Sequence, residues 1–109
     1  MAQDRLLLQA RLENLLITQE EPDKKLQVYF QRPENVEMQY PCIVYSRDTA
    51  VTRFADNALY INKKRYQVTV IDEDPDSEIP DKVAALPLTS FERFFVAENL
   101  NHDVYSLYF

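Results

Sequence analysis

The sequence of 109 residues contains no glycine, whereas about 7% is usual in proteins. Glycine adopts a positive φ most easily, so every turn that needs this conformation must use another residue, of which Asn and Asp are the best suited. The absence also excludes glycine-rich phosphate-binding loops and the dinucleotide-binding fingerprint, because both require close approach of the backbone to phosphate. Residues suited to such turns recur along the chain: Asn35, Asp56-Asn57, Asn62, Asn99 and Asn101.

The length favours a single domain over residues 1–109. The formal net charge is −6, and the longest run of basic residues is Lys63-Lys64-Arg65. Because gripping a phosphate backbone requires positive charge, nucleic acid is disfavoured as a ligand. The chain has no run of about 20 apolar residues, so we expect no membrane partner.

The segment Arg65–Ser77 is the most informative stretch, because its residue pattern changes abruptly. Alternating apolar and polar residues predict a strand over Arg65–Ile71. The acidic, proline-containing segment that follows leads into a helix predicted at about Ser77–Leu86. Either Pro75 or Pro80 fits the first turn of this helix, so two starting points remain open.

The remaining elements are predicted from hydrophobic periodicity. Leu8, Leu12, Leu15 and Leu16 indicate an amphipathic helix over Asp4–Ile17, with Leu6 and Leu7 widening its apolar stripe. The predicted strands are Leu26–Arg32, Cys42–Arg47, a short Ala58–Ile61, Ser90–Ala97 and Asp103–Phe109.

We expect Asp48–Asn57 to be an extended loop and Glu98–His102 to be a long hairpin turn. The fold class is therefore α+β, with a mainly antiparallel sheet of about five strands. The N-terminal helix and the short second helix are expected to pack on one face of this sheet.

The acidic residues Asp72, Asp74 and Asp76 have the spacing that opens a calcium-binding loop. Such a loop also needs glycine at its sixth position and glutamate at its twelfth, where this chain has Ser77 and Val83. We favour the interpretation that the acidic residues cap the following helix. A magnesium-dependent enzyme that uses the three carboxylates is the alternative.

No other set of residues predicts catalysis. His102 is the only histidine and lies in a predicted turn, where a surface position is favoured over a catalytic base. Cys42 is the only cysteine, which excludes an intramolecular disulfide and favours a buried position in a strand. We therefore predict no catalytic residue, no metal ligand and no cofactor.

The last two predicted strands are rich in aromatic residues that point to both faces of the sheet. One face can form the core, and either the second helix or a neighbouring subunit can cover the other. The final strand ends at Phe109, and we expect this terminal edge to invite strand addition from a neighbour. The residues concerned are Phe91, Phe94, Phe95, Tyr105, Tyr108 and Phe109.

Four motifs resemble those of small siphophage tail terminators, also described as tail-completion or minor capsid proteins, mostly from phages of Gram-positive bacteria. They are PCIVYSRD at Pro41–Asp48, ADN…Y at Ala55–Tyr60, YQVTVIDEDPDSEIPDKV at Tyr66–Val83, and a closing block of Ser90-Phe91 with Ala97–Tyr105. Glu98 stands where the family pattern has Asp. The resemblance covers about Tyr40–Phe109, and the N-terminal helix carries no motif.

The resemblance implies a structural virion protein and no enzymatic activity. A tail terminator forms a ring, expected to be hexameric, that caps the tail tube, stops its polymerisation and joins the head. The implied partners are further copies of the chain, the tail tube protein and the head–tail connector or stopper, with DNA only passing through the lumen. The implied location is the tail or neck of the virion, and the host cytoplasm during assembly.

The resemblance supplies no catalytic residue. The interfaces are expected in the 58–65 hairpin, the Asp48–Asn57 loop and the terminal hairpin. The predicted interface residues are Phe54, Tyr60, Lys63, Lys64, Arg65, Tyr105, Tyr108 and Phe109.

Three other functions remain open. A connector or stopper of the same virion shares the size, the style of fold and the ring assembly. The metal-dependent enzyme requires the three aspartates to converge on one ion. A regulatory binding module would be a monomer that binds a peptide at a sheet edge.

Overall fold

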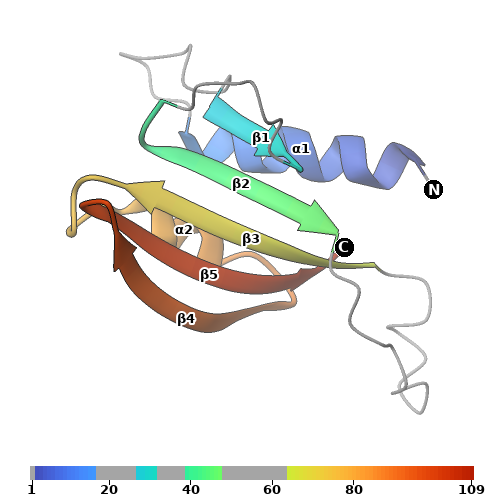
Figure 1. The fold of residues 1–109 in the computed structure, drawn as a ribbon. Coiled ribbons are helices and arrows are strands. Elements are labelled where there is room, and N and C mark those ends of the chain that lie inside the picture. The colour runs from blue at the N-terminus through green and yellow to red at the C-terminus, as the bar shows by residue number, and fades with distance from the viewer. Residues whose placement is uncertain (1, 17–26, 32–38, 48–63) are drawn as a thin grey trace.

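The computed structural model describes residues 2–16, 27–31, 39–47 and 64–109. Five strands form one sheet in the order β1-β2-β3-β5-β4, and both helices lie on the same face of it (Figure 1). This arrangement confirms the predicted α+β class. The elements are α1 (Ala2–Leu16), β1 (Val28–Phe30), β2 (Cys42–Arg47), β3 (Arg65–Asp72), α2 (Ile79–Ala84), β4 (Thr89–Ala97) and β5 (Leu100–Tyr108).

The sheet is mixed but mostly antiparallel. The pairs β2–β3, β3–β5 and β4–β5 are antiparallel, whereas β1 runs parallel to β2. The predicted loop Asp48–Asn57 and the predicted short strand Ala58–Ile61 lie outside the described residues. Within the described part of the chain, no helix is long and apolar enough to cross a membrane.

The core lies between the helices and one face of the sheet. Alternation along β3 directs Tyr66, Val68 and Val70 to this face, and all three are buried. Leu12 of α1 and Val83 of α2 pack against them and are fully buried. The other buried members of the cluster are Leu8, Leu16, Val28, Ile43, Tyr45, Tyr105 and Leu107.

Leu6 and Leu7 do not extend the buried stripe of α1. Their side chains are 55% and 61% exposed. The helix therefore buries the narrow stripe of Leu8, Leu12 and Leu16, at a spacing of four residues.

The hairpin between β4 and β5 is tighter than predicted. Ala97 pairs with Leu100, so Glu98 and Asn99 alone form the turn, with φ values of 54° and 64°. Two consecutive positive φ values define the turn type whose twist matches that of an antiparallel pair. His102 is consequently a residue of β5 and not of a turn.

The positive-φ positions of the described chain fall mostly on unexpected residue types. They are Gln31, Leu88, Glu98 and Asn99, so only Asn99 is one of the predicted residues. Asn101, also predicted, lies in strand β5. The other predicted positions lie outside the described residues.

The prediction that the C-terminal strand forms the sheet edge is wrong. Strand β5 lies between β3 and β4, and β4 is the edge on this side. The reason is the order of pairing: β5 pairs with β3 along its whole length, from Arg65–Tyr108 to Asp72–Asn101. The exposed edge next to β5 is therefore strand β4.

Candidate interaction surfaces

Strand β4 carries four of the seven exposed large hydrophobic residues of the described chain. Every residue of β4 after Thr89 is exposed. The strand pairs with β5 and lies at the edge of the sheet, and although α2 contacts both β4 and β5, the side chains of β4 remain exposed. The β4 surface consists of Phe91, Phe94, Phe95 and Val96, which are 58%, 51%, 39% and 58% exposed.

The β4 surface extends over both faces of the sheet. Phe91 is opposite Tyr105, and Phe94 is opposite Asp103, on the side that carries the helices. Phe95 is opposite His102 on the other side and stacks on its ring, with centroids 4.5 Å apart and planes 12° apart. A neighbour that covers β4 would therefore contact aromatic rings on both faces as well as the free backbone edge.

Arg65 belongs to a small polar network on the face away from the helices. Its Nη2 lies 3.2 Å from Oε1 of Glu92, and its Nε donates to Oγ of Ser106 at 3.2 Å. The Ser106 hydroxyl in turn donates to Glu92. The network joins β3, β5 and β4, so this predicted interface residue holds the edge strand to the sheet.

A basic cleft lies at the end of the sheet where β1 and β2 finish and β3 begins. Its volume is about 320 Å³, and three of its seven lining residues carry a positive charge. Arg5 is held in place, because its Nη1 donates to the Tyr45 hydroxyl at 3.1 Å and its guanidinium lies 4.6 Å from the Phe30 ring centroid. The lining residues are Arg5, Leu6, Phe30, Gln31, Arg47, Lys64 and Tyr66.

An acidic turn, Asp72–Glu78, lies at the opposite end of β3 and contains five carboxylates. The Asp72 and Asp74 side chains accept hydrogen bonds from the backbone N–H groups of Asp74 and Asp76, each at 2.9 Å. The Asn101 amide donates to the backbone carbonyl of Asp72 at 3.1 Å. These bonds fix the backbone of the turn.

The acidic residues do not cap α2 through side-chain hydrogen bonds, although an acidic residue does occupy its N-cap position. Helix α2 begins at Ile79 with Pro80 in its first turn, which decides between the two predicted starts. Its N-cap residue Glu78 makes no side-chain capping hydrogen bond. The nearby aspartates instead stabilise the turn, because short carboxylates bond readily to a backbone N–H two residues ahead.

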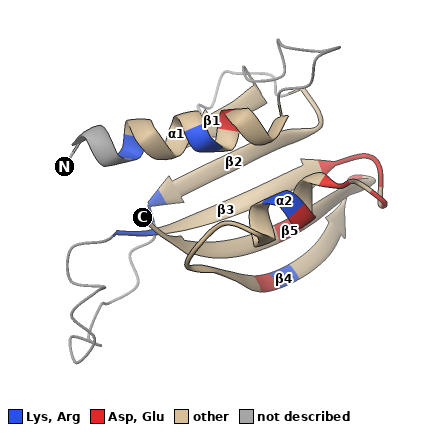
Figure 2. Cartoon of the chain, turned by 180° about the vertical axis from the view of Figure 1, so that it is seen from behind, with Lys and Arg blue, Asp and Glu red and all other residues tan. Residues whose placement is uncertain are grey.

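The chain has a marked separation of charge along β3. Figure 2 shows basic residues at the end of the sheet near the C-terminus and acidic residues on the turn at the other end. The eight residues of β3 separate the two ends, a distance of roughly 25 Å at the usual rise of a strand. The net charge of −6 is therefore unevenly distributed, with a basic end and an acidic end of the sheet.

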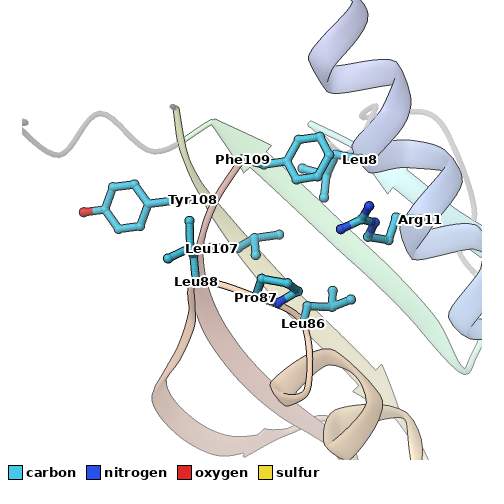
Figure 3. Close-up of a pocket in the computed structure, with 8 residues that line it drawn as sticks. All are labelled: Leu8, Arg11, Leu86, Pro87, Leu88, Leu107, Tyr108 and Phe109. Carbon is cyan, nitrogen blue, oxygen red and sulfur yellow. The ribbon is translucent and has the colours of Figure 1, made fainter. Parts of the chain in front are cut away.

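The C-terminal residues line a second, smaller pocket of about 100 Å³ beside α1 (Figure 3). Phe109 packs against the core, and the Arg11 guanidinium lies 5.3 Å from its ring centroid. The Tyr108 ring points away from α1 in Figure 3 and is half-buried. The backbone of Phe109 pairs with that of Lys64, which extends the β3–β5 ladder.

The structure distributes the predicted interface residues among different environments. Tyr105 is 5% exposed, and its hydroxyl donates to the Pro80 carbonyl at 3.1 Å, so it belongs to the core. Lys64 lines the basic cleft, and Tyr108 and Phe109 line the second pocket. Phe54, Tyr60 and Lys63 lie outside the described residues.

The residues weighed for chemistry do not converge on one another. The ring Nδ1 of His102 lies 3.0 Å from the Leu100 carbonyl oxygen, and Cys42 is buried as predicted. Among the described residues, no group of three His, Cys, Asp or Glu side chains is placed to hold a metal ion.

Several titratable groups have shifted pKa values for structural reasons. Burial raises the pKa of the Tyr45 and Tyr105 hydroxyls, which both serve as hydrogen-bond donors. Burial also raises the pKa of the Asp103 carboxyl, and the charge of Asp81 raises it further. The two tyrosine hydroxyls thus link the sheet to Gln9 of α1 and to Pro80 of α2.

Sequence reasoning missed Arg5 and Arg47 as members of one site. They come from α1 and from the end of β2, and the packing of α1 beside β1 brings both to the same cleft. No local pattern marks either residue. A search for cations at the ends of predicted elements would have identified Arg5, Arg47 and Lys64, but it would not have shown that the three residues lie together.

Comparison of the chain with protein-family models, with curated proteins and with solved structures finds no match.

Proposed function

We propose that the chain is a structural subunit of a phage virion, a tail terminator that caps the tail tube and joins it to the head. The motifs at Pro41–Asp48, Ala55–Tyr60 and Tyr66–Val83 and the closing block support the assignment through their resemblance to this family. The α+β fold agrees with the small subunit that the resemblance implies.

The observation that carries the proposal is the β4 surface. Exposed edge strands are usually short, charged or covered, because an apolar edge pairs with other chains. Strand β4 has nine residues, and four of them are exposed large apolar side chains. Such an edge is typical of a chain that is covered by a neighbour in a stable assembly.

Electron microscopy of lysates from a phage in which this gene is silenced tests the proposal. We expect overlong tails of variable length and full heads that stand apart from them. Tails of normal length that fail to join heads would assign the chain to the connector or stopper. Normal infectious particles would refute both structural roles.

Complementation of the silenced phage tests whether the β4 surface carries the function. Phe91→Ser combined with Phe94→Ser removes two exposed rings, so the chain should fold but fail to restore tails of normal length. Leu7→Ser removes another exposed apolar side chain, on α1, and should restore them. Equal rescue by both variants would mean that the β4 surface is not used in assembly.

A further inference from the structure

The basic cleft gathers three positive charges in a chain whose overall charge is negative. Arg5, Arg47 and Lys64 line it, and among the described residues no carboxylate lines it. Arg5 is oriented by Tyr45 and Phe30, and Arg47 is exposed at the end of β2. Positioned cations beside apolar walls favour a ligand that combines carboxylates with some apolar surface.

The acidic turn has the complementary chemistry. Glu73, Asp74, Asp76 and Glu78 are exposed, and Pro75 adds an exposed apolar ring between them. The hydrogen bonds within the turn hold its backbone in one conformation. A pre-organised loop loses less conformational entropy on binding than a flexible one.

We propose that the basic cleft of one copy of the chain receives the acidic turn of the next copy. The two surfaces lie at opposite ends of β3, so each copy can use both surfaces at once. The contact is therefore head-to-tail, and its repetition gives a closed ring when the rotation between copies divides a full turn. The inference rests on the proposed function, because it names the contact by which the terminator subunits join.

A second copy fits better than an unrelated acidic protein. The chain itself supplies one turn for every cleft, and the two are separated by a rigid strand. Charge complementarity of this kind sets the register of association and disfavours the cleft-to-cleft and turn-to-turn arrangements.

Sedimentation velocity at low salt, on charge-reversed variants of the purified chain, tests the contact. The experiment uses about 0.1 mM protein, where an interface of micromolar affinity is nearly saturated. Variant A carries Arg47→Glu and Lys64→Glu, and variant B carries Glu73→Lys and Asp76→Lys. No side-chain hydrogen bond is formed by these four residues among the described contacts, so circular dichroism should show both variants folded.

Each variant alone places like charges at the contact, and its dissociation constant should rise at least about tenfold. An equimolar mixture restores opposite charges at every contact, because A and B then alternate, and association should return. The chain with all four substitutions should also associate by itself. Lys82→Glu, at an exposed position outside the cleft, matches the charge change of Arg47→Glu and should leave association intact.

The outcomes separate this inference from the proposed function. If variants A and B associate as strongly as the wild-type chain, the contact lies elsewhere on the molecule. This result overturns the inference but does not affect the proposal that the chain forms a ring. Failure of the mixture to associate, with both variants folded, also overturns it. A wild-type chain that remains monomeric refutes the head-to-tail contact, and tail morphology in the silenced phage then decides the proposed function separately.

Discussion

The fold of the chain disfavours the negative charge of Asp103. It lies on the helix-facing side of β5, opposite Val70 on β3 and Phe94 on β4. Burial raises the pKa of its carboxyl above the ordinary 3.8, the charge of Asp81 on α2 raises it further, and His102 opposes the shift. Relative to the unfolded chain, the fold therefore disfavours the charged form of this carboxyl.

The substitution Asp103→Asn should stabilise the fold at about pH 7 and have little effect at about pH 3. A carboxyl with a raised pKa in the folded state favours folding at acidic pH, and this contribution is lost as the pH rises through the folded-state value. Removing the charge should therefore raise the free energy of unfolding by a few tenths of a kcal/mol at neutral pH, the usual size for partly exposed charges. Melting temperatures by circular dichroism at both pH values measure the effect.

The Asp81→Asn background is the control for Asp103→Asn. Because burial is the larger cause of the shift, the gain should shrink in this background without disappearing. A gain of equal size at acidic and neutral pH would mean that the amide improves packing, and charge would then not be the cause.

At the scale of single elements, the β4–β5 hairpin contains a strained position. Glu98 has φ 54°, a conformation that Asn tolerates better than Glu. Glu98→Asn should raise the free energy of unfolding by about 0.5–1 kcal/mol, measured by urea denaturation. Ala97→Asn, one residue earlier in β4, should destabilise the chain because Asn is disfavoured in strands.

The docking of α1 depends on a narrow stripe of leucines. Leu12 is fully buried against the sheet, so Leu12→Ala should lower the free energy of unfolding by about 2–5 kcal/mol. Leu7→Ala makes the same change on the same helix at a side chain that is 61% exposed, and its effect should stay within about 0.5 kcal/mol. Similar losses for both would mean that helix propensity, and not packing, determines the result.

Local patterns in the sequence predict the elements well where burial repeats with a simple period. The alternation in β3 and the leucine spacing in α1 each identify both the element and its buried face. A hairpin turn beginning at Glu98 is predicted, but its two-residue length and the positive φ of Glu98 are not, because Glu rarely adopts a positive φ and the twist of the paired strands imposes it here.

The order of strands and the interaction surfaces depend on contacts between distant parts of the chain. No local pattern shows that β5 would pair with β3 and leave β4 at the edge. Consequently the exposed aromatic residues are those of β4, which are not among the predicted interface residues, whereas Tyr105, which is among them, is buried. The basic cleft combines α1, β1, β2 and the start of β3, which only the folded chain brings together.

At the scale of the whole molecule, charged surfaces and an apolar surface lie on separate parts of the fold. The cleft and the acidic turn occupy the two ends of β3, whereas the β4 surface lies along one edge of the sheet. A ring subunit needs lateral contacts with its neighbours and further contacts with the tube or connector. The charged ends serve the lateral contact in our proposal, which leaves β4 available for a partner in the virion.

The salt dependence of association should distinguish a contact between the charged ends from a contact through the β4 surface. The screening length falls from about 10 Å at 0.1 M salt to about 3 Å at 1 M, so the contact between charged ends should weaken as salt increases. Burial of the β4 rings is not screened, and any association through β4 should persist or strengthen.

We therefore expect wild-type oligomers to dissociate between about 0.05 M and 1 M NaCl in sedimentation velocity. The variant with Phe91→Ser and Phe94→Ser should show the same salt dependence, because its charged ends are intact. Arg47→Glu should shift the dissociation to lower salt, since one positive charge of the cleft is replaced by a negative one. Wild-type oligomers that are insensitive to salt but lost in the β4 variant would assign the subunit contact to β4 and not to the charged ends.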